Sequence, residues 1–196
     1  MPYYDKHPAG ILLLIIALVW FGMEATRYTG GRDARPEATA VTRPWWRAAS
    51  VAGLVAANVV LYLASHLVPA AAIQPGAVSF AVGLTLMAAG VALRGWAFAT
   101  LGRYFTLNVM VSADQQVISS GPYRVLRHPS YTGVLLISAG VGLAAANWVS
   151  LAALVVLPLA LLLWRIHVEE QALLAALDDR YRSYAAGHKR LVPLVW

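Results

Sequence analysis

Apolar residues in this sequence gather into long runs, and polar segments rich in arginine separate them. Three nearly uninterrupted apolar runs come first: residues 9–23, 48–68 and 77–101. Each approaches the ~20 residues that an α-helix needs to cross the hydrocarbon core of a bilayer. A fourth run, residues 131–164, is too long for one crossing and is interrupted near Asn147 and Trp148, which suit an interfacial turn. We therefore predict five transmembrane helices, of which the last two are short and form a helical hairpin.

The first run resembles a secretory signal because it is short. It lacks a lysine-rich leader and a small-residue cleavage site, and Trp20 and Phe21 stand where an interfacial anchor would lie. We expect this run to be a retained helix.

The distribution of lysine and arginine predicts the orientation of these helices. Residues 27–47 carry five arginines, residues 94–127 carry four, and residues 165–196 carry five lysines or arginines. The connection at residues 69–76 and the turn at Asn147 carry none. Because cytoplasmic connections are enriched in these residues, we expect a multi-pass protein of the cytoplasmic membrane with its N-terminus outside and its C-terminus in the cytoplasm. The polar residues that could do chemistry then gather on the cytoplasmic side.

Composition favours a membrane protein and excludes several other classes. Hydrophobic residues make up 60% of the chain and charged residues 12%, which excludes a disordered chain and an ordinary soluble enzyme. The net charge of +6 could indicate a nucleic-acid partner, but the basic residues flank apolar runs, as expected for residues that face an anionic leaflet. We therefore expect the lipid bilayer, and no nucleic acid, as a partner. The absence of cysteine excludes disulfides and thiol nucleophiles.

After Arg165 the sequence changes from apolar to mixed. Within residues 168–186, the positions with the 4-4-3 spacing of a helical stripe are Leu173, Leu177, Tyr181 and Tyr184. This spacing predicts a C-terminal amphipathic helix that continues the last span along the cytoplasmic surface. The predicted fold class is an all-α integral membrane protein, with five transmembrane helices and this cytoplasmic helix.

The densest polar segment is Gly121-Pro-Tyr-Arg-Val-Leu-Arg-His-Pro-Ser-Tyr-Thr-Gly133. Pro129 suits the first turn of a helix, which places His128, Ser130 and Tyr131 at a helix N-terminus near the membrane surface. The free backbone N–H groups of such a terminus attract an anion. Alternatively, the segment is a basic interfacial anchor whose tyrosines form an aromatic belt.

A second polar cluster is Arg165-Ile-His-Val-Glu169-Glu170. Arg165 and Glu169 are four residues apart, which places them on one helical face, whereas Glu170 points about 100° away. A charge at the membrane edge is costly unless it is paired or hydrated, which makes these residues functional candidates. The alternative is an interfacial salt bridge with a solvated acidic neighbour.

Other polar or small residues have structural interpretations. The glycines of the third apolar run, Gly83, Gly90 and Gly95, favour close helix packing. Arg94, in the same run, is expected to extend its side chain to the inner membrane surface. The histidines outside the polar segment lack the spacing of metal ligands, and we expect no metal site.

Several motifs, in order along the chain, resemble one family. They are Leu101-Gly-Arg-Tyr-Phe-Thr106, Gln116-Val-Ile118, Gly121-Pro-Tyr123, Arg127-His-Pro-Ser-Tyr-Thr-Gly133, Arg165-x-x-x-Glu169-Glu170-x-x-Leu173, Tyr181-x-x-Tyr184 and Arg190-x-x-Pro193. This pattern resembles the isoprenylcysteine carboxyl methyltransferase family, which lies close to the membrane phospholipid methyltransferases. The motifs extend from Leu101 to Pro193, and residues 1–100 match the family only in hydropathy. We therefore expect three N-terminal transmembrane helices in residues 1–101, and the resemblance implies a cofactor-binding catalytic region in residues 102–196.

The resemblance implies S-adenosylmethionine as the methyl donor, in a cytoplasm-facing pocket formed by the last two helices and their flanking segments. The cofactor contacts that it implies are Asn108, Gln115, Gln116, Val117, Ile118, Tyr123, His128, Pro129, Ser130, Tyr131 and Glu169. Glu169 would hold the polar end of the cofactor, its ammonium, and Arg165 would face the substrate. These two are the implied catalytic residues.

The methyl acceptor decides which groups the reaction needs. A carboxylate is already nucleophilic at neutral pH and needs only orientation and partial loss of water, which paired hydrogen bonds from Arg165 would supply. An amine must first lose a proton to a base such as Glu170 or His167. The expected function is carboxyl O-methylation of an isoprenoid or other lipidic small molecule that enters from the bilayer. The alternatives are N-methylation of a phospholipid amine, or a non-catalytic membrane scaffold or carrier.

Overall fold

The fold consists almost entirely of helices, and a computed structural model describes residues 11–12, 15–23, 39–40, 45–102, 110–111 and 117–193. The named helices are α2 (Trp45–Leu67), α3 (Gly76–Leu101), α4 (Pro129–Ala144), α5 (Trp148–Leu177) and α6 (Asp179–Gly187). Two short 3-10 helices, η2 (Pro69–Ala71) and η4 (Gly121–Arg124), precede α3 and α4. Residues 11–12 and 15–23 are also helical. The strands β1 (Thr39–Ala40) and β2 (Met110–Val111) pair antiparallel, with Thr39 opposite Val111.

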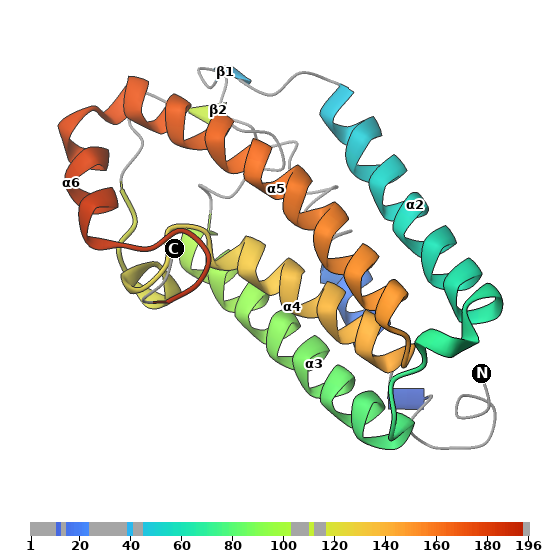
Figure 1. The fold of residues 1–196 in the computed structure, drawn as a ribbon. Coiled ribbons are helices and arrows are strands. Elements are labelled where there is room, and N and C mark those ends of the chain that lie inside the picture. Colours follow the sequence, from blue (N-terminus) through green and yellow to red (C-terminus); the bar gives the residue numbers. More distant parts are fainter. Residues whose placement is uncertain are drawn as a thin grey trace.

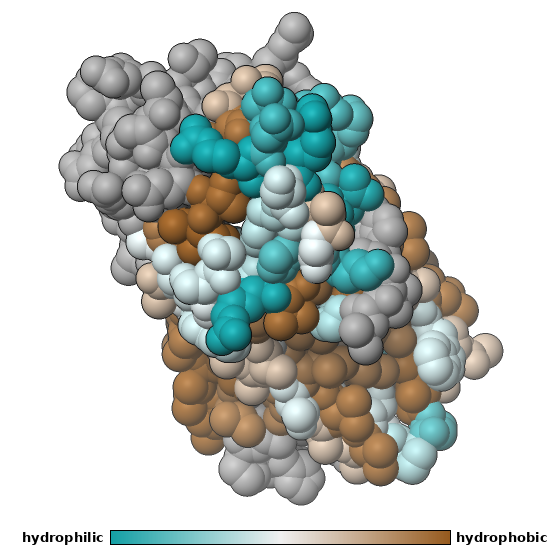
Figure 2. Space-filling model, turned by 90° about the vertical axis from the view of Figure 1, so that its left-hand side faces the viewer, coloured by the Kyte–Doolittle hydropathy of each residue, from teal (hydrophilic) through white to brown (hydrophobic). Residues whose placement is uncertain are grey.

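The long helices lie side by side in the order α3, α4, α5 and α2 (Figure 1). At one end of this bundle, α6 turns back from the end of α5 (Figure 1). Figure 2 looks at that end and shows hydrophilic residues gathered on it, with apolar residues over the part of the bundle below. The polar residues are therefore concentrated at one end of an otherwise apolar bundle.

The predicted apolar runs coincide with helices. α2 and α3 cover residues 48–68 and 77–101 to within three residues at each end, and α4 and α5 form the predicted hairpin. Among the described residues, α3 and α5 are long and apolar enough to cross a membrane, whereas α4 and the apolar segment Val55–Ala64 are shorter. Part of the first run lies outside the described residues, and the count of five crossings stays a prediction.

The predicted continuation of the last span beyond Arg165 is confirmed, but residues 168–186 belong to two helices and not to one. α5 continues to Leu177 as a helix of 30 residues, much longer than the 16 residues of α4, and α6 follows as a separate helix. The sequence after Arg165 contains no glycine or proline before Gly187, so nothing ends α5 at the membrane edge. The break falls at Asp178, whose φ of 41° lies in the left-handed region.

The turn of the hairpin is fixed by Asn147, which is buried. Its Oδ1 accepts hydrogen bonds from the backbone N–H groups of Val149 at 3.0 Å and Ser150 at 3.1 Å, which caps the start of α5. Its Nδ2 donates to the carbonyl oxygens of Ala64 at 3.3 Å and Val68 at 3.1 Å, at the end of α2. One side chain therefore closes the hairpin and joins it to α2.

α3 and α4 approach so closely that both need glycine at the contact. A Cβ atom on Gly83 would lie 2.6 Å from the carbonyl oxygen of Gly140, and one on Gly90 would lie 2.6 Å from that of Gly133. A Cβ atom on Gly95 would lie 3.6 Å from the nearest atom of another segment, which is an ordinary contact. Glycine-mediated packing is therefore confirmed for Gly83 and Gly90, and it does not hold for Gly95.

We expect Gly83→Ala to destabilise the protein by on the order of 2 kcal/mol, because the added methyl group must push two helix backbones apart. Gly95→Ala makes the same change on the same helix where there is room. It should leave the unfolding temperature unchanged or raise it, since alanine favours helix. Thermal unfolding in detergent measures both variants, and equal effects would contradict the close α3–α4 contact.

Candidate functional site

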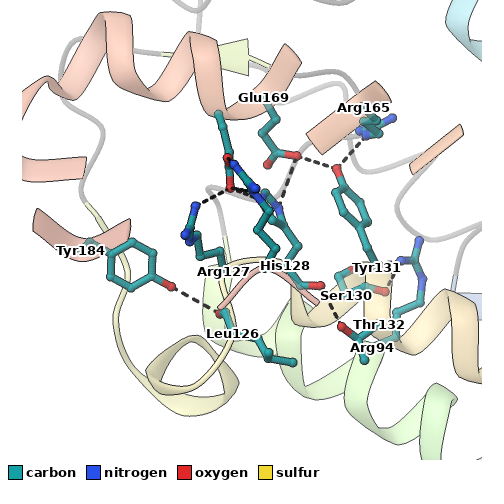
Figure 3. Close-up of polar contacts among 12 residues, drawn as sticks. Arg94, Leu126, Arg127, His128, Ser130, Tyr131, Thr132, Arg165, Glu169 and Tyr184 are labelled. Carbon is teal, nitrogen blue, oxygen red and sulfur yellow. Dashed lines mark hydrogen bonds and ion pairs between the residues drawn. The ribbon is translucent and has the colours of Figure 1, made fainter. Parts of the chain in front are cut away.

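The polar residues of the site surround the first turn of α4 (Figure 3). The chain enters this turn through η4, which begins at Gly121 with a φ of 55°, a left-handed conformation that glycine adopts without strain. Pro129 occupies the first position of α4, as predicted, and is fully buried. The turn is therefore a rigid entry into α4 rather than an exposed loop.

Residues 188–191, called the C-terminal strap below, lie along this turn. The backbone N–H of Arg127 donates to the carbonyl oxygen of Lys189 at 2.7 Å. The backbone N–H of His128 donates to the carbonyl oxygen of Arg190 at 3.1 Å. The hydroxyl of Thr132 donates to the carbonyl oxygen of Leu191 at 2.7 Å. The strap therefore holds the chain on both sides of the start of α4.

Glu170, on α5, is the buried acid of the site, with a side chain that is 8% exposed. Its carboxylate accepts hydrogen bonds from Nη1 of Arg127 at 2.9 Å and from Nε and Nη2 of Arg190 at 3.0 and 2.9 Å. Nε2 of His128 lies 3.2 Å from its Oε1. The hydrogen bond to Glu170 is the main cause that raises the pKa of Arg190. The sequence analysis left open that Glu170 is a solvated acid beside an Arg165–Glu169 salt bridge. The structure contradicts this alternative, because Glu170 is buried and joins α5 to the turn before α4 and to the strap.

Glu169 takes part in a second set of contacts, with Tyr131 and Arg165 (Figure 3). The Tyr131 hydroxyl donates to Oε2 of Glu169 at 2.6 Å and accepts a hydrogen bond from Nε of Arg165 at 2.7 Å. The Glu169 side chain is 29% exposed, and Nδ1 of His128 lies 3.9 Å from its Oε2. The rings of His128 and Tyr131 are stacked, with their centres 5.4 Å apart. Arg165 and Glu169, predicted to share a helical face, are thus linked through a tyrosine of α4.

Tyrosines connect α6 to the turn before α4. The hydroxyl of Tyr184 donates to the carbonyl oxygens of Tyr123 at 2.8 Å and Leu126 at 3.3 Å. Burial raises the pKa of Tyr184 to about 12. Burial, followed by the negative charge of Glu169, raises the pKa of Tyr123. Both hydroxyls therefore stay protonated at neutral pH, and the burial of Tyr123 argues against a membrane-surface aromatic belt.

Arg94, on α3, does not extend to the membrane surface as predicted. Its side chain is buried, and Nη1 donates to Oγ of Ser130 at 2.6 Å and to the Ser130 carbonyl oxygen at 3.1 Å. Its guanidinium lies 4.6 Å from the centre of the Phe98 ring. Arg94 follows Gly90 by one helical turn, and Gly90 packs against α4. The same face of α3 therefore directs Arg94 to the start of α4.

The structure brings part of the predicted cofactor set together. His128, Tyr131 and Glu169 lie within contact distance of one another. Ser130 instead bonds to Arg94, so its hydroxyl has a structural partner. Tyr123 and Pro129 are buried, in η4 and at the start of α4. Of the other predicted residues, Val117 and Ile118 are half-buried just before η4, and Asn108, Gln115 and Gln116 lie outside the described residues.

Four residues hold this site together: Arg94, Arg127, Glu170 and Arg190. Sequence reasoning gave no site role to the three arginines and considered Glu170 only as a possible base for an amine acceptor. All of the four except Arg94 stand in the family-like motifs, which was the available signal. The sequence does not reveal that Arg127 pairs with Glu170, because the two residues are 43 positions apart in the chain. In the part of the chain that the structure describes, no group of three or more acidic or histidine side chains is arranged to hold a metal ion.

The fold and the site together define a helical, membrane-type protein whose charged residues gather at one end of an apolar bundle. Residues 81–175 match the model of the isoprenylcysteine carboxyl methyltransferase (ICMT) family. Protein-S-isoprenylcysteine O-methyltransferase B of Arabidopsis thaliana is 33% identical over 115 residues, which are 58% of this chain and 58% of the plant protein. Protein-S-isoprenylcysteine O-methyltransferase of Schizosaccharomyces pombe is 29% identical over 117 residues, 50% of this chain and 48% of the yeast protein.

A solved structure of the eukaryotic intramembrane Ras methyltransferase ICMT has the same fold. It is 26% identical to this chain with a TM-score of 0.63, over 74% of this chain and 52% of the other. Over residues 81–175 the chain is therefore similar to the isoprenylcysteine carboxyl methyltransferase family. It spans about half the length of these relatives.

We expect Glu170→Gln to destabilise the fold by about 3 kcal/mol, because it leaves two guanidinium groups beside a neutral amide in a largely buried place. This is the lower end of the usual range, since Arg190 is 37% exposed. Arg182→Gln removes a pair with Asp178 and Asp179 at the surface and should change stability by less than about 0.5 kcal/mol. Thermal unfolding in detergent tests both, and an unchanged Glu170→Gln variant would contradict the proposed role of this acid.

Proposed function

We propose that this protein is a membrane methyltransferase that transfers a methyl group from S-adenosylmethionine to the carboxylate of an isoprenylcysteine or another lipidic acid. The observation that carries the proposal is the chain of contacts from Arg165 through Tyr131 to Glu169. A guanidinium and a carboxylate on either side of one hydroxyl suit two ligands of opposite charge. The similarity of residues 81–175 to the isoprenylcysteine carboxyl methyltransferase family supports the same chemistry.

Glu169 would hold the methyl donor by its ammonium. Its carboxylate is partly exposed and is oriented by the Tyr131 hydroxyl, so it is both positioned and within reach of a ligand. A carboxylate–ammonium contact of this kind is a charge-assisted hydrogen bond. S-Adenosylmethionine supplies a methyl group that its sulfonium makes electrophilic. The residues proposed for the adenosyl part precede η4 in the chain: Asn108, Gln115, Gln116, Val117 and Ile118.

Arg165 would hold the acceptor. A guanidinium carries five N–H donors in a planar fork, so the bond from Nε to Tyr131 is compatible with paired bonds to a carboxylate. The carboxylate needs no general base, and its orientation towards the methyl group supplies most of the rate acceleration. Because Tyr131 also bonds to Glu169, the two ligand-binding residues are held at a fixed separation.

The contacts of Glu170 favour a carboxylate over an amine as acceptor. An amine would need a base near Glu169 that removes its proton. The Glu170 carboxylate is occupied by Arg127, Arg190 and His128, which makes it a poor acceptor for that proton. Carboxyl O-methylation is therefore the reaction that these residues fit, and the experiment below distinguishes it from N-methylation of a phospholipid amine.

The apolar surface of α5 suggests how a lipidic acceptor reaches the site. The turns of α5 that precede Arg165 expose four large hydrophobic residues: Val156, Leu157, Leu163 and Trp164. An isoprenoid chain would lie against this surface, within the bilayer, and place its carboxylate beside Arg165. In this proposal residues 102–196 bind the methyl donor, residues 1–101 help to form the acceptor side, and the site faces the cytoplasm.

The proposal is tested with the full chain in lipid nanodiscs, S-adenosylmethionine labelled in its methyl group, and an S-farnesylcysteine derivative that has a free carboxylate. We expect label to enter the lipid fraction and to be released as methanol by mild base, because methyl esters hydrolyse under those conditions. Label that resists base would instead indicate an amine acceptor. If the protein binds no S-adenosylhomocysteine in a calorimetric titration, it is not a methyltransferase.

Substitutions of Glu169 and Arg165 should have different effects, the first on cofactor binding and the second on turnover. Glu169→Gln should weaken S-adenosylhomocysteine binding by roughly tenfold or more, because it removes a charged partner of the ammonium. Arg165→Ala should keep that affinity within a factor of about two and lower kcat by about a hundredfold, because the acceptor loses its orientation. Gln171→Ala, on the exposed side of α5, serves as the control and should change neither value. Loss of cofactor binding in Arg165→Ala would show that its assignment to the acceptor is wrong.

A further inference from the structure

The turn η4 packs against the C-terminal end of α3, at the polar end of the bundle, and is drawn in yellow in Figure 1. A Cβ atom on Gly121, the first residue of η4, would lie 3.2 Å from Nε1 of Trp96 on α3. Trp96 is nevertheless 56% exposed. An exposed tryptophan near the end of an apolar helix is typical of the boundary between the hydrocarbon and the headgroups of a bilayer. The start of η4 therefore lies at the depth where the bilayer ends.

The turn directs two of its side chains inward and two outward. Tyr123 and Leu126 are buried, with 7% and 5% of their surface exposed. Between them, Arg124 is exposed and Val125 is 53% exposed. The turn thus presents a cation and an apolar side chain next to each other, on the surface that continues from Trp96.

The C-terminal strap adds a second cation to this surface. Leu126 forms a parallel bridge with Lys189, and the backbone N–H of Arg127 donates to the Lys189 carbonyl oxygen at 2.7 Å. Lys189 is exposed. Across the described part of the chain, neither Arg124 nor Lys189 forms an ion pair. We call Trp96, Arg124, Val125 and Lys189 the η4 surface.

The segments that form the η4 surface contain no acid that could neutralise it. Residues 117–168 and 180–196 include neither aspartate nor glutamate, and α3 has none either. Cations without acidic neighbours suit an anion, and the exposed valine and tryptophan beside them suit a ligand that is apolar on one side. A phospholipid headgroup combines these two properties, and it is the molecule that surrounds the end of a membrane span.

We propose that the η4 surface binds the headgroup of an anionic phospholipid. Arg124 and Lys189 would form charge-assisted hydrogen bonds to the phosphate, and Trp96 and Val125 would contact the glycerol and the first carbons of the acyl chains. Basic side chains next to a membrane span attract anionic lipids. The inference does not depend on the proposed function, because neither the methyl donor nor the acceptor takes part in it.

The test compares two lipids with identical acyl chains, anionic phosphatidylglycerol and zwitterionic phosphatidylcholine. Native mass spectrometry of the full chain in detergent measures the binding of each lipid. We expect the wild type to bind phosphatidylglycerol at least about tenfold more tightly, and the double variant Arg124→Gln/Lys189→Gln to bind both lipids alike. The matched control Arg180→Gln/Arg182→Gln removes two exposed arginines from α6 and should keep the preference of the wild type.

A substitution of Val125 tests the same surface without removing a cation. Val125→Asp places an acid beside Arg124, so it should abolish the preference for phosphatidylglycerol. Because the side chain is exposed, the variant should unfold at the wild-type temperature when no lipid is added. Val125→Thr has nearly the same shape and no charge, and it should bind both lipids as the wild type does.

Three results would overturn the proposal. The first is equal binding of the two lipids by the wild type. The second is a preference that the Arg124→Gln/Lys189→Gln variant keeps, or that the α6 control loses to the same extent, because the preference would then come from the net charge of the chain. The third is a preference that inorganic phosphate, at the concentration of the lipid, abolishes, because the surface would then bind a free anion and not a lipid.

Discussion

A carboxylate enclosed by guanidinium groups fixes the geometry on which the site depends. Glu170 is buried, and a buried charge of this kind is tolerated only where opposite charges and hydrogen bonds surround it. Its partners come from two other segments, Arg127 from the turn before α4 and Arg190 from the C-terminal strap. Because Glu169 is the next residue of the same helix and points about 100° away, the contact that fixes Glu170 also presents Glu169 to Tyr131. Adjacent acids thus have separate surroundings: Glu170 joins three segments of the chain, and Glu169 is the acid proposed to bind the methyl donor.

The first turn of α4 is held from both sides, which makes it a rigid platform. On one side, the backbones of α3 and α4 touch at Gly90 and Gly133, and Arg94 then bonds to Ser130 one turn further on. On the other side lies the strap. Tyr131, between these supports, can therefore hold its two partners in a geometry that does not have to be organised when a ligand arrives.

The helices of this fold could be predicted from the sequence because apolar runs of sufficient length have few alternatives in a membrane. Arg165 and Glu169 could also be paired, since a spacing of four residues places them on one helical face. The bridge by Tyr131 could not, because it depends on the distance between two helices and not on spacing within one. The same reason applies to Arg190 and Glu170. The orientation of Arg94 was predicted wrongly. Arg94 lies one helical turn after Gly90, so the packing predicted for Gly90 also indicated that Arg94 faces another helix.

The position of the strap also determines when the site can form during synthesis. Arg127 and His128 leave the ribosome first, Glu170 follows, and Arg190 comes last. A hairpin that inserts into the membrane as it is made therefore carries the acid at the bilayer edge before one of its two arginine partners has been translated. Completion of the proposed donor site is therefore a late step, and a chain that stalls between α5 and the strap has a complete hairpin without the contacts of Arg190.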